Sequence, residues 1–417
     1  MTLTSVRPPD RRVRRLAATL YGYAFLSELV LLYPVYALLF SDTGLTVWQI
    51  STLFVIWSAS SVLLEVPSGA LADAVSRRLL ICLAPLVTGA GFALWVLAPS
   101  YPAFALGFLL WGAGGALASG ALEALVFDEL DQLGAAGRYA RTVGRAETAG
   151  TVAVLLSIVL AGPVLALGGY LAVGAASVAT CVAAAALATR FPEHRRPAVT
   201  TPTGPAGDSD DPDDDLGWWA SLRAGLAEVR LDRGVRAAVL LVAAVSGVWG
   251  VLDEYTPLLA RDTGVAEPTV PLLLLLTWIG VSVGGLLAPA GERWGRRGYA
   301  VLLVASAVAL AAGALLGHPA GFVLIGAAFC GFQLATVLAG ARLQARIRGA
   351  SRATVTSLSG MATDVTVIAL YAGYGLLATG AGNAVAFAVA AVPYLLVAVL
   401  VVRRAGTGSR RATRSAE

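Results

Sequence analysis

Glu28, Asp253 and Asp364 are acidic residues that lie inside long apolar stretches of the sequence. A charged side chain at the centre of a bilayer costs at least about 2.5 kcal/mol on insertion scales, so an acid kept there is a functional candidate. Such a carboxyl group can take up and release a proton, or it can bind a cationic compound. The alternative for each acid is a structural hydrogen bond to a neighbouring helix.

Glu28 lies near the middle of the apolar run 16–40. About twelve residues of helix precede it, which at 1.5 Å per residue place it about 18 Å along the run. In a continuous helix, Tyr21 and Tyr36 would share a face with Glu28. The sequence therefore predicts a carboxyl group among aromatic rings near the membrane midplane, and Glu28 is the first candidate for proton coupling or substrate binding.

The other two acids leave more alternatives open. Asp364 has a similar depth in the run 353–379, where it could act in transport or make a helix–helix hydrogen bond. Asp253 is followed by Glu254 nearer the outer end of the run 235–260. These two acids could line the outer mouth of a cavity, or they could be charges close to the membrane surface.

Aromatic residues that could line a cavity beside these acids occur in both halves of the chain. For each of them, packing in the core or contact with lipid is the alternative. The candidates are Tyr21, Tyr36, Trp57, Trp111 and Trp249.

The elements that must position these residues are membrane-spanning helices. The chain is 57% apolar and 13% charged, whereas an ordinary globular domain is about 25% charged. A spanning helix needs about 20 mostly apolar residues, and such runs predict an all-α membrane protein with twelve transmembrane helices. The predicted spans are 16–40, 48–73, 79–98, 102–130, 142–165, 170–190, 235–260, 268–291, 298–317, 319–345, 353–379 and 382–402.

The arginines predict how these spans are oriented. All 30 basic residues are Arg, and apart from Arg261 they occur in the two tails and in every second loop. Because excess basic residues mark cytoplasmic loops, both termini are predicted to be cytoplasmic. This periodic placement explains the basic pI better than nucleic-acid binding does. The run 16–40 is too long for the apolar core of a signal peptide, so it is expected to be a retained helix.

The predicted organisation has five parts. A basic N-tail, 1–15, precedes a six-helix bundle, 16–190. A cytoplasmic linker, 191–234, contains an acidic spacer and then an interfacial helix, and leads to a second bundle, 235–403, and a C-tail, 404–417.

The two bundles repeat each other in sequence. Asp42-Thr43-Gly44 recurs as Asp262-Thr263-Gly264, Arg77-Arg78 as Arg296-Arg297 and Gly107-Phe108 as Gly321-Phe322. Parallel six-helix repeats with a site between them near the midplane are typical of transporters.

Two loops carry a resemblance to a known family. The segment Gly69-Ala70-Leu71-Ala72-Asp73-Ala74-Val75-Ser76-Arg77-Arg78 resembles the signature loop of the major facilitator superfamily, except that Ala74 and Ser76 replace a basic residue and a glycine. A second copy ends in Glu292-Arg293-Trp294-Gly295-Arg296-Arg297. Two further segments resemble bacterial permeases and drug exporters of this superfamily. They are residues 65–69, and residues 119–124 together with Asp128.

The resemblance implies the superfamily fold, with rocking halves around a central cavity. It also implies a cytoplasmic latch that holds the two halves together in one state of the transport cycle. The residues assigned to this latch are Gly69, Asp73, Arg77, Arg78, Glu65, Glu123, Asp128 and Arg145, with Glu292 and Arg296 as the second copy.

The predicted function is secondary active transport of a small amphipathic or hydrophobic organic compound, by proton-coupled efflux across a bacterial cytoplasmic membrane. The alternatives are nutrient uptake by proton symport or uniport, and a non-transporting membrane sensor on the same fold. A phosphate-binding loop of the Gly-x-x-x-x-Gly-Lys type cannot occur in a chain without lysine, so ATP is not expected as the energy source. We expect a monomer in the lipid bilayer, without enzymatic activity, cofactor or nucleic-acid partner. Cys82, Cys181 and Cys330 show no metal or disulfide spacing.

Overall fold

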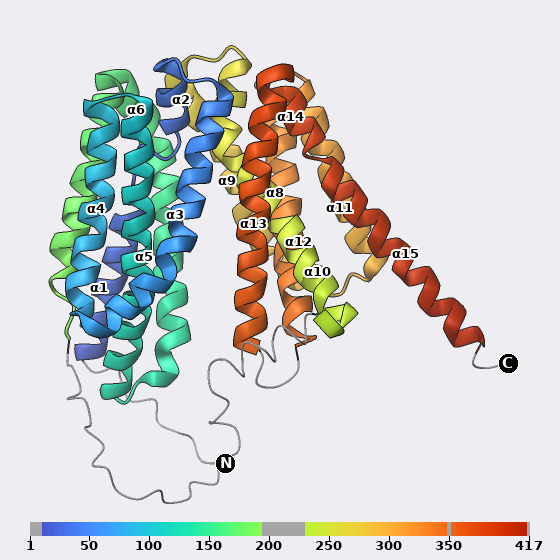
Figure 1. Cartoon of the computed structure of the whole chain (residues 1–417), viewed down its shortest axis with the longest axis horizontal. Coiled ribbons are helices and arrows are strands. Elements are labelled where there is room, and N and C mark those ends of the chain that lie inside the picture. The colour runs from blue at the N-terminus through green and yellow to red at the C-terminus, as the bar shows by residue number, and fades with distance from the viewer. Residues whose placement is uncertain (1–10, 194–229, 348–351, 415–417) are drawn as a thin grey trace, which may run out of the picture. The chain divides into compact units, whose positions relative to one another are not determined.

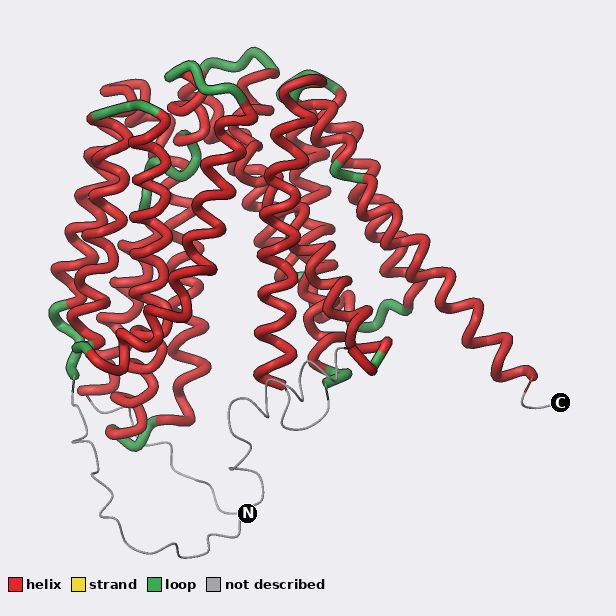
Figure 2. The backbone as a smooth tube through the Cα atoms, viewed as in Figure 1, coloured by secondary structure: helices red, strands yellow, loops and turns green. Residues whose placement is uncertain are grey.

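A computed structural model describes the backbone of residues 11–193, 230–347 and 352–414. The side chains of 65–74, 352–354 and 404–414 are outside this description. Most of the predicted linker, including its interfacial helix, and residues 1–10 of the N-tail also lie outside the described residues. The described residues form helices joined by loops and turns, without strands (Figure 2), so the all-α class is confirmed.

The chain divides by its contacts into two compact units (Figure 1). Unit 1 comprises residues 1–44 and 56–201, and unit 2 comprises 45–55 and 202–417. Residues 45–55 therefore belong to unit 2 although the chain continues from them into unit 1. The predicted five-part boundaries stay predictions.

Unit 1 contains α1 (Arg11–Glu28), α2 (Tyr36–Asp42), most of α3 (Val47–Ala74), α4 (Arg77–Leu97), α5 (Tyr101–Gln132), the short helix η1 (Ala136–Arg138) and α6 (Tyr139–Ala188). Within it, α4 packs against α5 and α6, and α1 packs against α6. Between α4 and α5, the indole N–H of Trp95 donates a hydrogen bond to the carbonyl of Phe104 at 3.1 Å.

Unit 2 contains α8 (Arg233–Asp262), η2 (Glu267–Thr269), α9 (Val270–Leu286), α10 (Ala288–Gly291), α11 (Arg296–Leu315), α12 (Gly321–Gln344), α13 (Arg352–Ala381), α14 (Asn383–Val389) and α15 (Val392–Arg414). The pair α9 and α12 approaches closely because glycines meet backbone there. A Cβ added to Gly280 would lie 2.1 Å from the carbonyl oxygen of Gly326, so any larger residue would separate the two helices.

Ten helices of the described chain are long and apolar enough to cross a membrane, against the twelve spans predicted. One of the ten, Ala136–Ala188, covers two predicted spans that are divided at Gly168 and Gly169. Gly169 has φ +62°, a conformation in which a residue with Cβ is strained. The other missing span is the first predicted run, 16–40. The count of twelve therefore stays a prediction.

The first predicted run is not one helix, and this corrects the face assigned to Glu28. The helix α1 ends at Glu28, and α2 begins at Tyr36. Pro34 lies in the break and prevents a helix from continuing through it, because proline lacks an N–H, clashes with the carbonyl four residues earlier and disfavours helical backbone at the residue before it. The freed N–H of Leu32 donates to Ser177 Oγ of α6 at 3.1 Å. Tyr36 therefore does not continue the helical face of Glu28.

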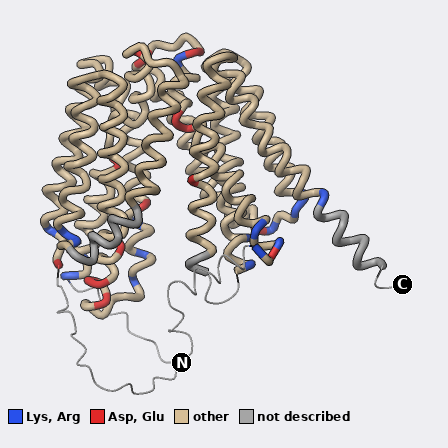
Figure 3. The backbone as a smooth tube through the Cα atoms, viewed as in Figure 1, with Lys and Arg blue, Asp and Glu red and all other residues tan. Residues whose placement is uncertain are grey.

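Charges gather at the helix ends in each unit, and few occur along the middle of the helices (Figure 3). The membrane-spanning segments are thus largely apolar, and the few acids within them can be considered one by one.

Candidate functional site

Glu28 is the last residue of α1, directly before the break. Its side chain is partly buried and lies against Gly150 of α6, where an added Cβ would be 3.2 Å from Glu28 Cγ. Glycine at this position makes room for the acid. Among the described residues, no side chain forms an ion pair or hydrogen bond with the Glu28 carboxylate. The acid is therefore available to a proton or a ligand.

An aromatic cluster in unit 1 follows the break. Trp111 of α5 stacks on Tyr33 at a centroid distance of 5.2 Å and on Trp57 of α3 at 4.5 Å. These three rings, which we call the aromatic stack, are partly exposed. Behind the stack, Tyr36 and Trp95 are buried, with exposures of 3% and 0%.

The packing of this cluster shows which of the aromatic residues predicted to line a cavity are buried and which are partly exposed. Tyr36 packs against Trp95, Phe108 and Phe40, so it is a core residue and does not line an open surface. Trp57 and Trp111 are partly exposed, and Tyr33 is an addition that sequence analysis missed. Tyr21 packs beside the buried core of unit 1.

Asp253 and Glu254 lie on α8 in unit 2 and are partly buried. Both carboxylates are within electrostatic reach of Tyr371 of α13. No described side chain forms an ion pair with either acid. Asp364, also on α13, already has an interaction partner, so it is not an unpaired carboxylate. The indole of Trp249 donates to Thr336 Oγ1 at 3.1 Å, which ties it to α12.

A polar network next to these acids was not expected from the sequence. The hydroxyls of Ser51 and Tyr255 are 2.6 Å apart, and Tyr374 stacks on Tyr255 at 3.7 Å. Tyr374 donates to Asn383 Oδ1 at 3.0 Å, and Asn383 Nδ2 donates to Asp262 at 2.7 Å. The network joins α8, α13 and α14 to the first turns of α3, all within unit 2.

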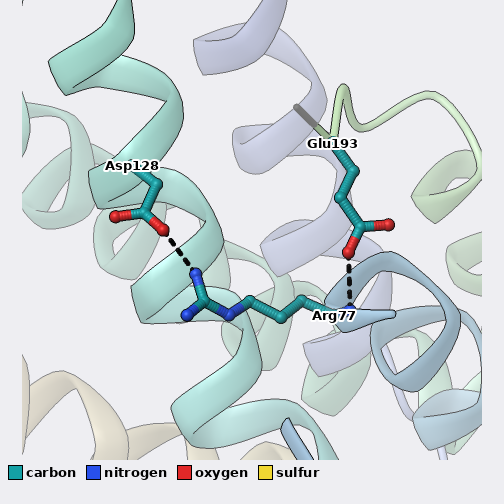
Figure 4. Close-up of polar contacts among 3 residues, drawn as sticks. All are labelled: Arg77, Asp128 and Glu193. Carbon is teal, nitrogen blue, oxygen red and sulfur yellow. Dashed lines mark hydrogen bonds and ion pairs between the residues drawn. The ribbon is translucent and has the colours of Figure 1, made fainter. Parts of the chain in front are cut away.

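The predicted latch is described only in part. Arg77 Nη1 and Asp128 Oδ2 are 2.5 Å apart (Figure 4), so the structure brings these two residues together. Glu123, Arg145, Glu292 and Arg296 are exposed, and Arg78 is exposed beside Arg77. The side chains of Glu65, Gly69 and Asp73 lie outside the described part of the structure.

A further acid, Glu193, completes this cluster. It accepts a hydrogen bond from the Arg77 backbone N–H at 2.8 Å (Figure 4). It also accepts one from the Ser76 hydroxyl at 2.5 Å. Ser76 is the N-cap of α4, where its hydroxyl accepts from the Leu79 N–H. Sequence analysis missed Glu193, and its position shortly after the last helix of unit 1, which ends at Ala188, was the available signal.

Comparison with known families decides what kind of protein this is. A model of the Major Facilitator Superfamily matches residues 17–365. The chain belongs to the major facilitator superfamily. Members of the superfamily are membrane transporters and are generally not enzymes, so this chain is a multi-pass secondary transporter of that family.

Solved structures with this superfamily fold are similar over nearly the whole chain. A nucleoside transporter, NupG, has a TM-score of 0.67 and 12% identity, covering 94% of this chain and 97% of its own. An inward-facing bacterial homologue of the human lysosomal transporter Spinster has a TM-score of 0.67 and 16% identity, with coverages of 95% and 99%. A D-xylose-proton symporter has a TM-score of 0.64 and 16% identity, covering 93% of this chain and 96% of its own. At these identities the likeness shows the fold alone. No curated protein matches the sequence.

Proposed function

We propose that this superfamily member is a proton-coupled transporter that exports a small amphipathic or hydrophobic organic compound from the bacterial cytoplasm. The observation that carries the proposal is the Glu28 carboxylate at the broken end of α1, without an ion-pair partner among the described residues. An ionised acid held in an apolar environment is unfavourable. A proton or a cationic substrate must therefore neutralise it when the site closes off from water.

The aromatic stack supports the choice of substrate class. Ligand sites are lined mainly by apolar and aromatic side chains, with few polar groups. Partly exposed rings of Tyr33, Trp57 and Trp111 can hold a flat or hydrophobic compound by offset stacking. Asp253 and Glu254 in unit 2 are two further acids that could carry protons.

Uptake by proton symport is the second candidate. It is favoured by the fold likeness to a D-xylose-proton symporter, and the same carboxylate would serve it. The two candidates differ in whether substrate and protons cross in opposite directions or together.

Proteoliposomes with an imposed pH gradient test the proposal. We expect a panel of ring-containing compounds to include one that moves against its gradient while protons move the other way. Glu28→Gln should abolish this proton-driven transport and retain exchange between labelled and unlabelled substrate. Glu147→Gln, an exposed acid on α6, is the matched control and should transport normally.

The outcomes separate the alternatives. Substrate and protons moving together would replace export by symport. Full proton-driven transport in Glu28→Gln would remove Glu28 from coupling. An absence of substrate-dependent proton flux across the whole panel would contradict transport of this class and favour a sensor role.

A further inference from the structure

Tyr371 of α13 is a buried tyrosine whose hydroxyl has no hydrogen-bond partner among the residues that the structure describes. The residue is only 3% exposed. The other buried tyrosines in the described part of unit 2 each form a hydrogen bond, and they are Tyr255, Tyr299, Tyr374 and Tyr394. An unpaired polar group inside a protein is costly and uncommon. The hydroxyl of Tyr371 is therefore an exception that points to a missing partner.

The Tyr371 hydroxyl reaches an accessible space. Within the described chain, the fully enclosed side-chain oxygens without a partner belong to Ser27 and Ser359. The unpaired oxygen of Tyr371 is thus accessible although the ring is buried. Phe54 of α3 and Tyr255 of α8 hold this ring, at centroid distances of 5.2 Å and 6.2 Å, and all three residues belong to unit 2. A ligand can therefore contact the hydroxyl within this unit.

Two acids of α8 lie beside the same space. Gly247 packs on α13, where an added Cβ would be 3.6 Å from Val367 Cγ2, and the ring contact described above lies further along both helices. Glu254 follows Gly247 on its face of α8 after two turns, and Tyr371 follows Val367 on its face of α13 after one turn. The charges of Glu254 and Asp253 act on Tyr371, in agreement with this placement.

Gly250 leaves room between the two acids. It precedes Asp253 by three residues and Glu254 by four, so the acids are its neighbours on the surface of α8. Side chains on a helix lean toward its N-terminus, which brings both carboxyl groups back toward Gly250. Apart from the local helix backbone, nothing would lie within 4 Å of a Cβ at Gly250. Neither acid has an ion pair or hydrogen bond to a described residue, so both can accept from a ligand in this space.

The acceptors around this space fit an ammonium group. A protonated primary amine carries one positive charge and three N–H donors. Two carboxylates and a phenol oxygen supply three acceptors, and a neighbouring aromatic ring attracts a cation further. The described residues contain no group of three or more His, Cys, Asp or Glu side chains that could hold a metal ion. This set of side chains therefore favours an organic cation over a metal ion.

We propose that Asp253, Glu254 and Tyr371 bind the protonated amine of a small organic compound, and that Gly250 leaves the room for it. An ionised carboxylate in an apolar segment needs a counter-charge, which the ammonium group supplies. This site goes beyond the proposed function, because binding can be measured without transport. A failure of amine binding would leave proton coupling through Glu28 in place, and a failure of that coupling would leave the amine site in place.

Binding to the purified full-length protein in detergent tests the site. The probe is phenethylamine, which is an ammonium ion at neutral pH. Its matched control is phenethyl alcohol, which has the same ring and chain without the charge. Isothermal titration should show that the amine binds and that the alcohol binds at least about tenfold more weakly, because it lacks the charge-assisted contacts.

Variants of the three side chains assign the binding to them. We expect Glu254→Gln and Asp253→Asn each to weaken amine binding about tenfold, as loss of one charge-assisted contact does. Tyr371→Phe should weaken it about threefold, because a neutral hydrogen bond is lost. Glu147→Gln, an exposed acid of α6 in unit 1, is the matched control and should bind the amine as the wild type does.

Gly250→Leu tests the open space itself. The added side chain should occupy the space and abolish amine binding, and the core should stay intact because nothing else lies there. Gly115→Leu is the control, because Gly115 is an exposed glycine of α5 that also has open space at its Cβ position. If the acid and glycine variants fail to fold, Tyr371→Phe keeps the test available, since it removes a hydroxyl that has no partner within the described chain.

Any of the following results would overturn the proposal. Equal binding of the amine and the alcohol would show an apolar site without a role for charge. Wild-type amine binding in the variants of Asp253 and Glu254 would leave these acids to protons alone. Loss of amine binding in sodium chloride at the same concentration as the amine would assign the site to an inorganic cation. Absence of amine binding to the wild type would remove the site.

Discussion

The contact between Glu28 and Gly150 decides how much room the proposed coupling acid has. The Cβ position of Gly150 lies 3.2 Å from Glu28 Cγ, which is tighter than ordinary van der Waals contact. Any side chain at residue 150 must therefore displace the acid or separate α1 from α6.

We predict that Gly150→Ala lowers the transport rate and that Gly150→Val lowers it further, with both variants still folded. The reason is that the methyl groups occupy the space of the Glu28 side chain rather than of the core. Transport in proteoliposomes and thermal unfolding should be measured together. Gly144→Ala, a glycine of the same helix with open space around its Cβ position, is the control. Equal transport in all four proteins would contradict this.

The ion pair between Arg77 and Asp128 is exposed enough to contribute little stability. The side chains are 27% and 54% exposed, and pairs of this kind contribute about 0–1 kcal/mol to folding. We predict that Asp128→Asn shifts the unfolding free energy by less than about 1 kcal/mol but changes the transport rate, because the pair belongs to the proposed latch. A double-mutant cycle with Arg77→Gln would measure the coupling, and an unchanged rate in every variant would remove the pair from the latch.

At the scale of elements, the break between α1 and α2 is the most consequential feature. It ends α1 at Glu28 and places Tyr33 and Tyr36 in non-helical chain or in a second helix. Backbone groups freed within a membrane must find partners in the protein. The Ser177 hydroxyl does this for Leu32, and itself donates to the Val173 carbonyl at 2.8 Å.

We predict that Ser177→Ala destabilises the protein by about 1–3 kcal/mol, because the buried N–H of Leu32 loses its acceptor. Ser157→Ala is the matched control. Ser157 is equally buried in α6, but its hydroxyl donates to Val154 of its own helix, so its removal leaves no N–H unpaired. The free energy of unfolding in detergent should be measured for both variants. Equal decreases in this free energy would show that the break does not depend on Ser177.

At the scale of the whole molecule, the arginines predict the topology. The C-terminal end of α5 should face the cytoplasm, because basic residues follow it in the sequence. The turn that precedes the start of α5 should then face outward. In a chain whose three cysteines are replaced, we predict that Gln132→Cys reacts with a membrane-impermeant maleimide only after cells are opened. Ser100→Cys should react in intact cells. The reverse pattern would invert the predicted orientation.

Much of the fold could be predicted because each membrane helix corresponds to one continuous apolar run of the sequence. Apolar runs and breakers located nearly every helix, and the signature loops indicated the family that the family model confirms. The Arg77 and Asp128 pair was also anticipated, since the resemblance placed both at the same helix ends. The predicted face of Glu28 was wrong, because the apolar run 16–40 contains Pro34 and is divided into two helices.

The sequence by itself determined the helices, the family and the small set of acids within the apolar segments, because burial in lipid requires long apolar runs and makes each charge conspicuous. Tertiary structure decided which of those acids have partners. Asp364 has an interaction partner, and Glu28 has no ion-pair partner among the side chains that the structure describes. Glu193 and Ser177 contact residues more than a hundred positions away in the sequence. Such contacts depend on how helices pack and rotate against each other, and that geometry leaves no local pattern in the chain.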